Sequence, residues 1–212
     1  MLLERHANDE ILFSDEKLFV LEPSHNAQND RMYAACLQDI PYEKLGVPRS
    51  QSAQSVMVWG AVTKRGKLPL LFIEKGVKIN KDYYLQNVLK NHLLKYSATL
   101  FKNDHFVFLQ DSAPAHKAKV VQQWCVANLP GFISSKEWPA SSPDLNALDY
   151  SIWGYMLQQL TNLKPISLEK FKLLLERIWN EMPDDYIRAA CEVFPKRLLL
   201  VIKNKGQPIE LK

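Results

Sequence analysis

The order of the hydrophobic patterns along the chain limits its fold more than any other feature. Short apolar runs typical of strands come first, at residues 11–21, 55–62 and 68–73. A turn containing Gly66 joins the last two runs, so the three predict an antiparallel start to a sheet. Within the first run, polar residues 14–17 predict either a bulge or a hairpin turn.

Beyond residue 80, helical patterns alternate with short apolar runs that suit buried strands. Helical spacing covers residues 81–95 and 117–128, and the strand candidates are residues 105–109 and 132–133. After residue 146 the pattern is helical only, with three helices that begin near Leu148, Ser167 and Pro183. A strand meander, then an alternation, then helices alone predicts an α/β fold with a mixed sheet.

Residues 22–55 form a long polar segment rich in Pro, Asn, Gln and Ser, which predicts an excursion with little regular structure. Loops of this length inside a compact domain are usually functional or poorly ordered. No stretch reads as a linker between two cores, so the 212 residues are expected to form one domain. Its core is expected at about 8–165, with C-terminal helices at about 166–205.

Composition restricts the class of protein without identifying it. Hydrophobic residues make up 47% of the chain and charged residues 24%, as in folded globular proteins. The net charge of +4 permits a polyanionic partner but does not require one. The chain has three widely spaced cysteines, no signal-peptide core and no apolar run of the roughly 18 residues that a membrane span needs. Reduced thiols and an intracellular, soluble protein are therefore expected.

Asp15 lies in the first strand pattern, where a carboxylate is unexpected. By the period-two alternation of a strand it shares a face with Ile11 and Phe13, which would turn its charge toward the core. A buried carboxylate needs a partner or a metal. The alternative is that Asp15 only begins a turn with Glu16 and Lys17, and the pattern alone favours that turn.

Asp111 follows an apolar strand pattern and precedes Pro114, a residue suited to the first turn of a helix. The carboxyl ends of sheet strands are where α/β folds bind their ligands. An N-terminal helix cap explains the same position equally well.

Asp149 begins a helical pattern on one face with Ile152, Trp153 and Met156, so its charge would lie on the inward stripe. The alternative is the third position of a capping box opened by Asn146. The pattern alone leaves both interpretations open.

Five short stretches of sequence together resemble one family. They are residues 14–17, 28–33, 55–59, 110–116 and 138–150, which read Ser-Asp-Glu-Lys, Gln-Asn-Asp-Arg-Met-Tyr, Ser-Val-Met-Val-Trp, Gln-Asp-Ser-Ala-Pro-Ala-His and Trp-Pro-Ala-Ser-Ser-Pro-Asp-Leu-Asn-Ala-Leu-Asp-Tyr. In this order they resemble the mariner superfamily of transposases. The 37 residues between Asp111 and Asp149 resemble the subgroup whose third acid is Asp, not a Glu at a shorter interval.

The resemblance implies a ribonuclease H-like mixed sheet flanked by helices, with a helical C-terminal part. It implies that Asp15, Asp111 and Asp149 bind two divalent ions, normally magnesium (Mg²⁺) with manganese (Mn²⁺) as a substitute. Asp15 would contact both ions, and the centre would cut and rejoin DNA at transposon ends and target sites. It also implies a homodimer acting in the nucleus, with neither a membrane nor a small-molecule substrate. Carboxylates suit this role, because two hard cations in phosphodiester chemistry prefer oxygen ligands.

Two features depart from the family pattern or compete with it. Asp144, separated from Asp111 by 32 residues, is a rival third acid, although its place after Pro143 favours a turn or cap. Ala147 stands where relatives usually have Pro, so the loop that enters the last catalytic helix is expected to be less stiff.

Several basic and aromatic side chains are candidates for DNA contacts. The basic candidates are Lys64, Arg65, Lys67, His116, Lys117 and Lys119, with Arg197, Lys203 and Lys205 as a further C-terminal group. For His116 a solvated or capping role is favoured over one beside a metal. Trp59, Trp138 and Trp153 could stack on bases, although core packing is favoured for Trp59 and Trp153.

Family members usually begin with paired helix-turn-helix modules of about a hundred residues that read the transposon ends. Here the first catalytic residue is already Asp15, so that region is expected to be absent. Two other functions stay open: a catalytically silent DNA-associating or dimerising module, and a nuclease acting on RNA/DNA hybrids.

Overall fold

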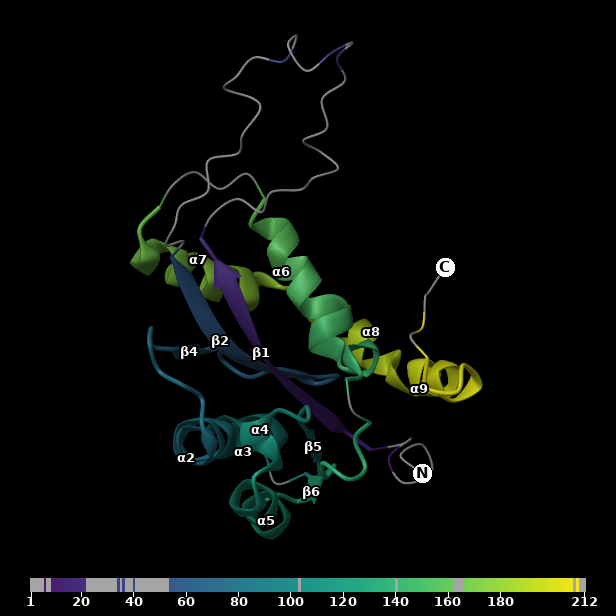
Figure 1. Cartoon of the computed structure of the whole chain (residues 1–212). Coiled ribbons are helices and arrows are strands. Elements are labelled where there is room, and N and C mark those ends of the chain that lie inside the picture. The colour runs from purple at the N-terminus through teal and green to yellow at the C-terminus, as the bar shows by residue number, and fades with distance from the viewer. Residues whose placement is uncertain are drawn as a thin grey trace.

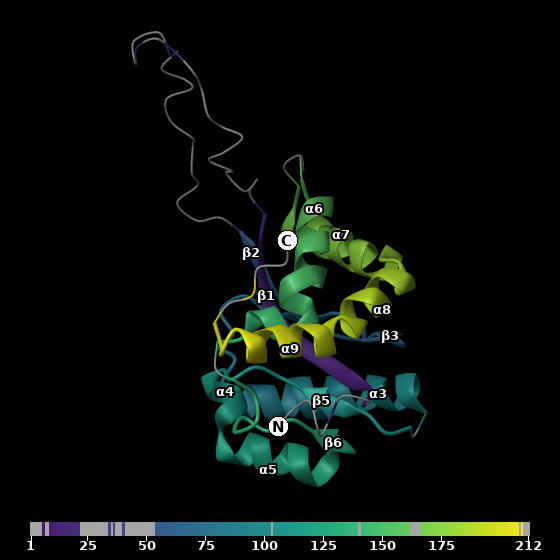
Figure 2. The ribbon, with the colours of Figure 1, turned by 90° about the vertical axis from the view of Figure 1, so that its right-hand side faces the viewer.

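A computed structural model describes residues 6, 9–21, 34, 36, 40, 54–102, 104–139, 141–161, 166–207 and 209. These residues form a six-stranded mixed sheet that carries helices on both faces (Figures 1 and 2). The predicted α/β class, with a mixed sheet and a helical C-terminal part, is confirmed. In this part of the chain no helix is long and apolar enough to cross a membrane.

Strand β1 (Ile11–Val20) lies at the centre of the sheet. It pairs antiparallel with β2 (Ser55–Thr63) and parallel with β5 (Val107–Leu109). The edges are β6 (Gly131–Phe132), parallel to β5, and β3 (Gly66–Lys67) and β4 (Leu71–Ile73), both antiparallel to β2. The predicted antiparallel start is therefore confirmed, and β5 adds the parallel part.

The predicted bulge or turn at residues 14–17 is wrong. Strand β1 runs without a break, and its pairing with β2 is continuous from Phe13 opposite Val62 to Val20 opposite Ser55. The polar side chains do not interrupt the strand, because its backbone groups are satisfied by neighbouring strands and the side chains find distant partners. The strand predicted at residues 68–73 begins only at Leu71, because Pro69 has no N–H to donate to a ladder.

One face of the sheet is covered by the helices between β4 and β6. They are a continuous helix made of α2 (Lys81–Tyr83), the π-helical η3 (Tyr84–Leu93) and α3 (Leu94–Phe101), then α4 (Pro114–Lys117) and α5 (Lys119–Asn128). The first helix is thus longer than the predicted 81–95. The second pattern is broken at Ala118, which has an extended ψ of 132°.

The other face carries the C-terminal helices. They are η5 (Leu148–Ile152), which continues into α6 (Trp153–Gln159), then α7 (Leu168–Glu181), α8 (Asp184–Glu192) and α9 (Phe194–Lys203). The single helix predicted from Pro183 is therefore two. Pro195 suits the first turn of α9 but would remove a backbone hydrogen bond inside a longer helix.

Alternation along β1 sends successive side chains into two separate cores. Ile11, Phe13 and Phe19 pack with the C-terminal helices, whereas Leu12 packs with the helices of the opposite face. Asp15 and Glu16 consequently lie on opposite faces of the sheet. The excursion predicted at 22–55 lies mostly outside the described residues.

Candidate active site

Asp15 points from β1 toward the C-terminal helices, so its predicted orientation is confirmed and the turn-start alternative is wrong. Its Oδ2 accepts a hydrogen bond of 2.7 Å from Trp153 Nε1, at the start of α6. Burial, together with the nearby charge of Asp149, raises the pKa of Asp15 to about 8. The carboxyl group is therefore held among other acids with too little positive charge to balance them.

Asp111 lies just beyond the carboxyl end of β5, beside β1. Its Oδ1 accepts hydrogen bonds from the Ala113 backbone N–H (2.9 Å) and from His116 Nδ1 (2.6 Å). Partial burial acts to raise the pKa of Asp111, but these bonds and the charge of His116 leave it below its ordinary value. The residue both stabilises the turn before α4 and stands at a ligand-binding edge, so the two predicted roles coexist.

Asp149 lies in the first turn of η5. Its side chain is exposed and opens into a cavity, so the prediction that it points into the core is wrong. The capping-box alternative is also wrong, because the Asn146 N–H donates to the Pro143 carbonyl and not to Asp149. Partial burial of the carboxyl group raises the pKa of Asp149. The charge of Asp111 adds to this shift, and the charge of Lys17 opposes it.

A cavity of about 280 Å³ brings the second and third aspartates together. Its lining comes from the segments around Asp111 and before Asp149: Asp111, Ser112, Ala113, Lys117, Trp138, Ser141, Ser142, Pro143, Asn146 and Asp149. Asp15 is outside this lining but is coupled to it through the charge of Asp149. Three aspartates from distant parts of the sequence thus form one electrostatic cluster.

The three aspartates are not arranged as a complete set of metal ligands. Among the described residues, no three His, Cys, Asp or Glu side chains lie close enough together to hold a metal in the positions observed. The donors available are carboxylate oxygens, the ligands that magnesium and manganese prefer. Burial, and after it the charge of Asp149, raises the pKa of Asp15, and a bound cation would stabilise the ionised carboxylate.

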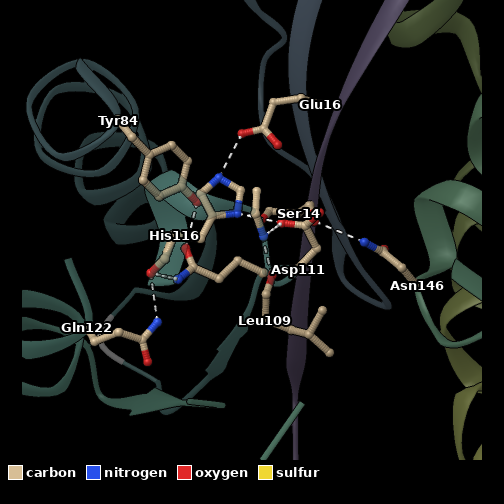
Figure 3. A network of polar contacts seen from close by, with 10 residues as sticks. Ser14, Glu16, Tyr84, Leu109, Asp111, His116, Gln122 and Asn146 are labelled. Atoms are coloured by element: carbon tan, nitrogen blue, oxygen red, sulfur yellow. Dashed lines mark hydrogen bonds and ion pairs between the residues drawn. The ribbon is translucent and has the colours of Figure 1, made fainter. Parts of the chain in front are cut away.

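Glu16 is a polar residue that the sequence interpretation missed, and His116 is one for which it favoured the wrong role. His116 is only 2% exposed, so the predicted solvated or capping role is wrong and no surface is left for a DNA phosphate. Its Nδ1 donates to Asp111 and its Nε2 lies 3.3 Å from Glu16 Oε1 (Figure 3). Burial lowers the pKa of His116, but these two carboxylates outweigh it and raise the value to about 9. The one available signal was the alternation that puts Glu16 on the opposite face from Asp15.

The rival acid Asp144 lies in the turn η4 (Pro143–Leu145) and does not line the cavity. Its Oδ2 accepts a hydrogen bond of 3.1 Å from the Ile209 N–H, near the C-terminus. Its carbonyl accepts one of 3.0 Å from Arg197, whose guanidinium lies 3.8 Å from the centre of the Tyr150 ring. Asp144 and Arg197 therefore connect α9 to the turn, which agrees with the predicted turn role of Asp144.

The candidate DNA contacts fall at two ends of the sheet. Lys64, Arg65 and Lys67 lie at the end opposite Asp111, where Glu10, Asp104 and Asp184 pair with them. Lys117 lines the cavity itself, and Lys119 is exposed at the start of α5. Trp59 and Trp153 are fully buried, and Trp138 is 5% exposed, so none of the three presents an open ring face for stacking. Lys203 and Lys205 are exposed at the end of α9.

The sequence of the chain is similar to those of known transposases. No protein-family model matches the chain. It is 30% identical over 201 residues to the Tc3 transposase of Caenorhabditis elegans, a match that covers 94% of the chain and 57% of that relative. It is 26% identical over 197 residues to the Tcb2 transposase of Caenorhabditis briggsae, covering 93% of the chain and 68% of that relative. The chain thus spans somewhat more than half the length of these transposases.

The fold is similar to that of solved transposase structures. The Mos1 mariner paired-end complex with Mg superposes with a TM-score of 0.80 at 20% identity, covering 99% of the chain and 60% of the Mos1 chain. The Mos1 catalytic domain superposes with a TM-score of 0.71 at 19% identity, covering 98% of the chain and 88% of that domain. The architecture is therefore that of the ribonuclease H-like catalytic domain. The chain is homologous to the Tc3 and Tcb2 transposases, and it has the fold of the Mos1 mariner transposase catalytic domain.

Proposed function

We propose that this chain is the catalytic unit of a cut-and-paste DNA transposase, a metal-dependent endonuclease and strand transferase. The observation that carries the proposal is the electrostatic cluster of Asp15, Asp111 and Asp149: burial raises the pKa of Asp15 and of Asp149, and the charge of Asp149 adds to the first shift and that of Asp111 to the second. Perturbed acids gathered at a cavity are typical of functional sites.

The three aspartates would hold the two magnesium or manganese ions that we propose for this site. When bound, the ions would supply activation of water or a 3′-hydroxyl and stabilisation of the leaving oxygen. Crystal structures of the related Mos1 catalytic domain and complexes include Mn and Mg, which supports a divalent ion.

The chain's own residues keep the acids in place. Trp153 Nε1 donates to Asp15 from the helix that carries Asp149. Asn146 Nδ2 donates to the Ser14 carbonyl (3.0 Å), while its Oδ1 accepts from the Leu148 N–H (3.1 Å). These contacts join the start of the third-acid helix to β1, so they fix Asp149 relative to Asp15. Such support matters because a misplacement of about 1 Å can cost about 10²-fold in rate.

DNA is the proposed substrate, and the solved relatives include complexes with transposon ends. We propose that the chain works as a homodimer on DNA in the nucleus, as one catalytic domain. Lys117 would contact a phosphate beside the acids, because it is the lysine that lines their cavity.

The direct test is nicking of supercoiled DNA by the purified chain in the presence of manganese or magnesium. We expect nicked product that disappears with EDTA and in the Asp111→Ala variant, because the variant loses one ligand of the proposed ions. Product no greater than in that variant would contradict the endonuclease proposal. DNA binding that survives in a variant lacking all three aspartates would then favour the silent DNA-associating module, and cleavage of RNA/DNA hybrids alone would favour the hybrid nuclease.

Replacement of Lys117 by Ala is expected to weaken DNA binding and to reduce the slope of log affinity against log salt by about one, the effect of one lost phosphate contact. Arg65→Ala is the matched variant, because Arg65 pairs with Asp104 and Glu10 at the far end of the sheet. Titration of a labelled duplex at several salt concentrations measures both slopes. A slope that falls for Arg65→Ala and not for Lys117→Ala would place the DNA at the opposite end.

A further inference from the structure

Glu16 is a carboxylate next to the first proposed metal ligand, yet it lies on the other face of β1. Its side chain is 15% exposed, and its Oε1 is buried with no well-aligned hydrogen bond. Its ion-pair partner is His116, whose Nε2 lies 3.3 Å away. Glu16 therefore faces His116 and not the cavity that holds Asp111 and Asp149 (Figure 3).

The ring of His116 is held from several sides. It packs on Tyr84, with ring centroids 4.0 Å apart. The backbone carbonyl of His116 accepts hydrogen bonds from Gln122 Nε2 (2.9 Å) and Gln110 Nε2 (3.5 Å). The Tyr84 hydroxyl donates to Gln110 Oε1 (2.7 Å). With its backbone, ring face and both ring nitrogens engaged, the imidazole has one orientation available.

This orientation determines how Asp111 presents its two oxygens. Oδ1 receives both the 2.9 Å bond from the Ala113 N–H and the 2.6 Å bond from His116. Neither the Ala113 N–H nor His116 bonds Oδ2. Oδ2 is thus the oxygen of Asp111 that remains available for a cation.

We propose that Glu16 and His116 are a positioning pair that fixes the Asp111 carboxylate with Oδ1 bound to the protein and Oδ2 presented to a divalent cation. The proposal rests on the proposed function, because it concerns the same metal site. In the proposed arrangement, Glu16 and His116 contact neither the metal nor DNA. Partners that orient a metal ligand commonly change metal affinity or activity by about 10- to 100-fold when mutated.

Two variants of His116 test the contributions of its two ring nitrogens separately. The side-chain nitrogen of Asn occupies the place of His Nδ1, so His116→Asn keeps a donor for Asp111 and loses the contact with Glu16. The side-chain nitrogen of Gln occupies the place of His Nε2, so His116→Gln keeps the contact with Glu16 and loses the donor for Asp111. Electron paramagnetic resonance of free Mn²⁺ measures affinity for the site that Asp111→Ala removes.

We expect His116→Gln to weaken Mn²⁺ binding by about 10- to 100-fold and His116→Asn to bind much closer to wild type. Glu16→Ala should weaken binding less than His116→Gln does, because Glu16 acts only by orienting the His116 ring, and for the same reason it should add little to His116→Gln. His116→Gln binding as tightly as wild type, or His116→Asn binding as weakly as His116→Gln, would overturn the proposal.

The control is His92→Asn, the same change at another buried histidine, whose Nε2 bonds the Pro69 carbonyl (2.8 Å) away from the cavity. It should change the melting temperature in EDTA but leave Mn²⁺ affinity unaltered, and a loss of affinity there would overturn the site-specific interpretation. Nicking is measured on the same samples. A wild-type chain that binds Mn²⁺ through Asp111 without nicking DNA contradicts the proposed function, whereas tight binding by His116→Gln contradicts the positioning pair.

Discussion

Replacement of Asp149 by Asn is expected to remove metal-dependent nicking, whereas Asp144→Asn is expected to keep it. Asp149 lines the cavity with Asp111 and carries a raised pKa, while Asp144 lies outside that lining and accepts a bond from the Ile209 N–H. Removal of one electrostatic stabiliser from an active site costs about 10²- to 10³-fold in rate. We expect the nicking rate of Asp149→Asn to fall by at least this factor.

The two variants are a matched pair, because both replace a carboxylate by an amide of the same shape. Asn at position 144 can still accept the Ile209 bond, so the melting temperature of that variant should stay near that of wild type. Single-turnover nicking with manganese, compared at equal folded protein, gives the two rates. Loss of nicking in Asp144→Asn with full activity in Asp149→Asn would assign the third acid to position 144.

Alternation and motif order predicted the parts of the site that depend on local pattern. The period of two placed Asp15 on the face of Ile11 and Phe13, where Trp153 meets it. The same reading mistook residues 14–17 for an interruption, because the partners of those polar side chains are far away in sequence. Leu109 accepts from Ser14 across 95 positions, and Trp153 donates to Asp15 across 138.

Helical periodicity misplaced Asp149 for a related reason. It identified the buried stripe of Ile152, Trp153 and Met156 correctly. Asp149 belongs to the same stripe, but it lies in the first turn of the helix, where its side chain lines the cavity. A pattern gives the face of a helix, whereas the depth at each turn depends on what packs there.

The contact of His116 with Glu16 could not be predicted from a local pattern. One partner, Glu16, lies in β1 and the other, Asp111, lies just beyond β5, and the pairing of β1 with β5 brings them together. Likewise, the pairing of Lys64 and Arg65 with Glu10 could not be read from charge alone. The sequence therefore predicted that these acids lie near one another better than it predicted the side chains that hold them.

Gly60→Ala is expected to lower the free energy of unfolding and to reduce nicking together. Gly60 lies directly opposite Asp15 in the β1–β2 ladder, and the Trp153 and Trp179 rings pass over it. A Cβ there would lie 2.8 Å from Trp153 Cη2 and 3.1 Å from Trp179 Cη2, closer than packed carbon atoms allow. Overpacking of this kind usually costs about 1–3 kcal/mol.

The added methyl group would also disturb the site. The Trp153 indole must move to accommodate it, and this indole donates the hydrogen bond to Asp15. The matched control is Gly154→Ala on the exposed side of α6, where a Cβ meets nothing within 4 Å. Alanine in a helix is favoured over glycine by about 0.5–1 kcal/mol, so this variant should be stabilised and remain active. Urea unfolding gives the stabilities and plasmid nicking the rates, both at a temperature where each variant is folded. Full nicking activity in a destabilised Gly60→Ala chain would show that the Trp153–Asp15 bond does not position the first acid.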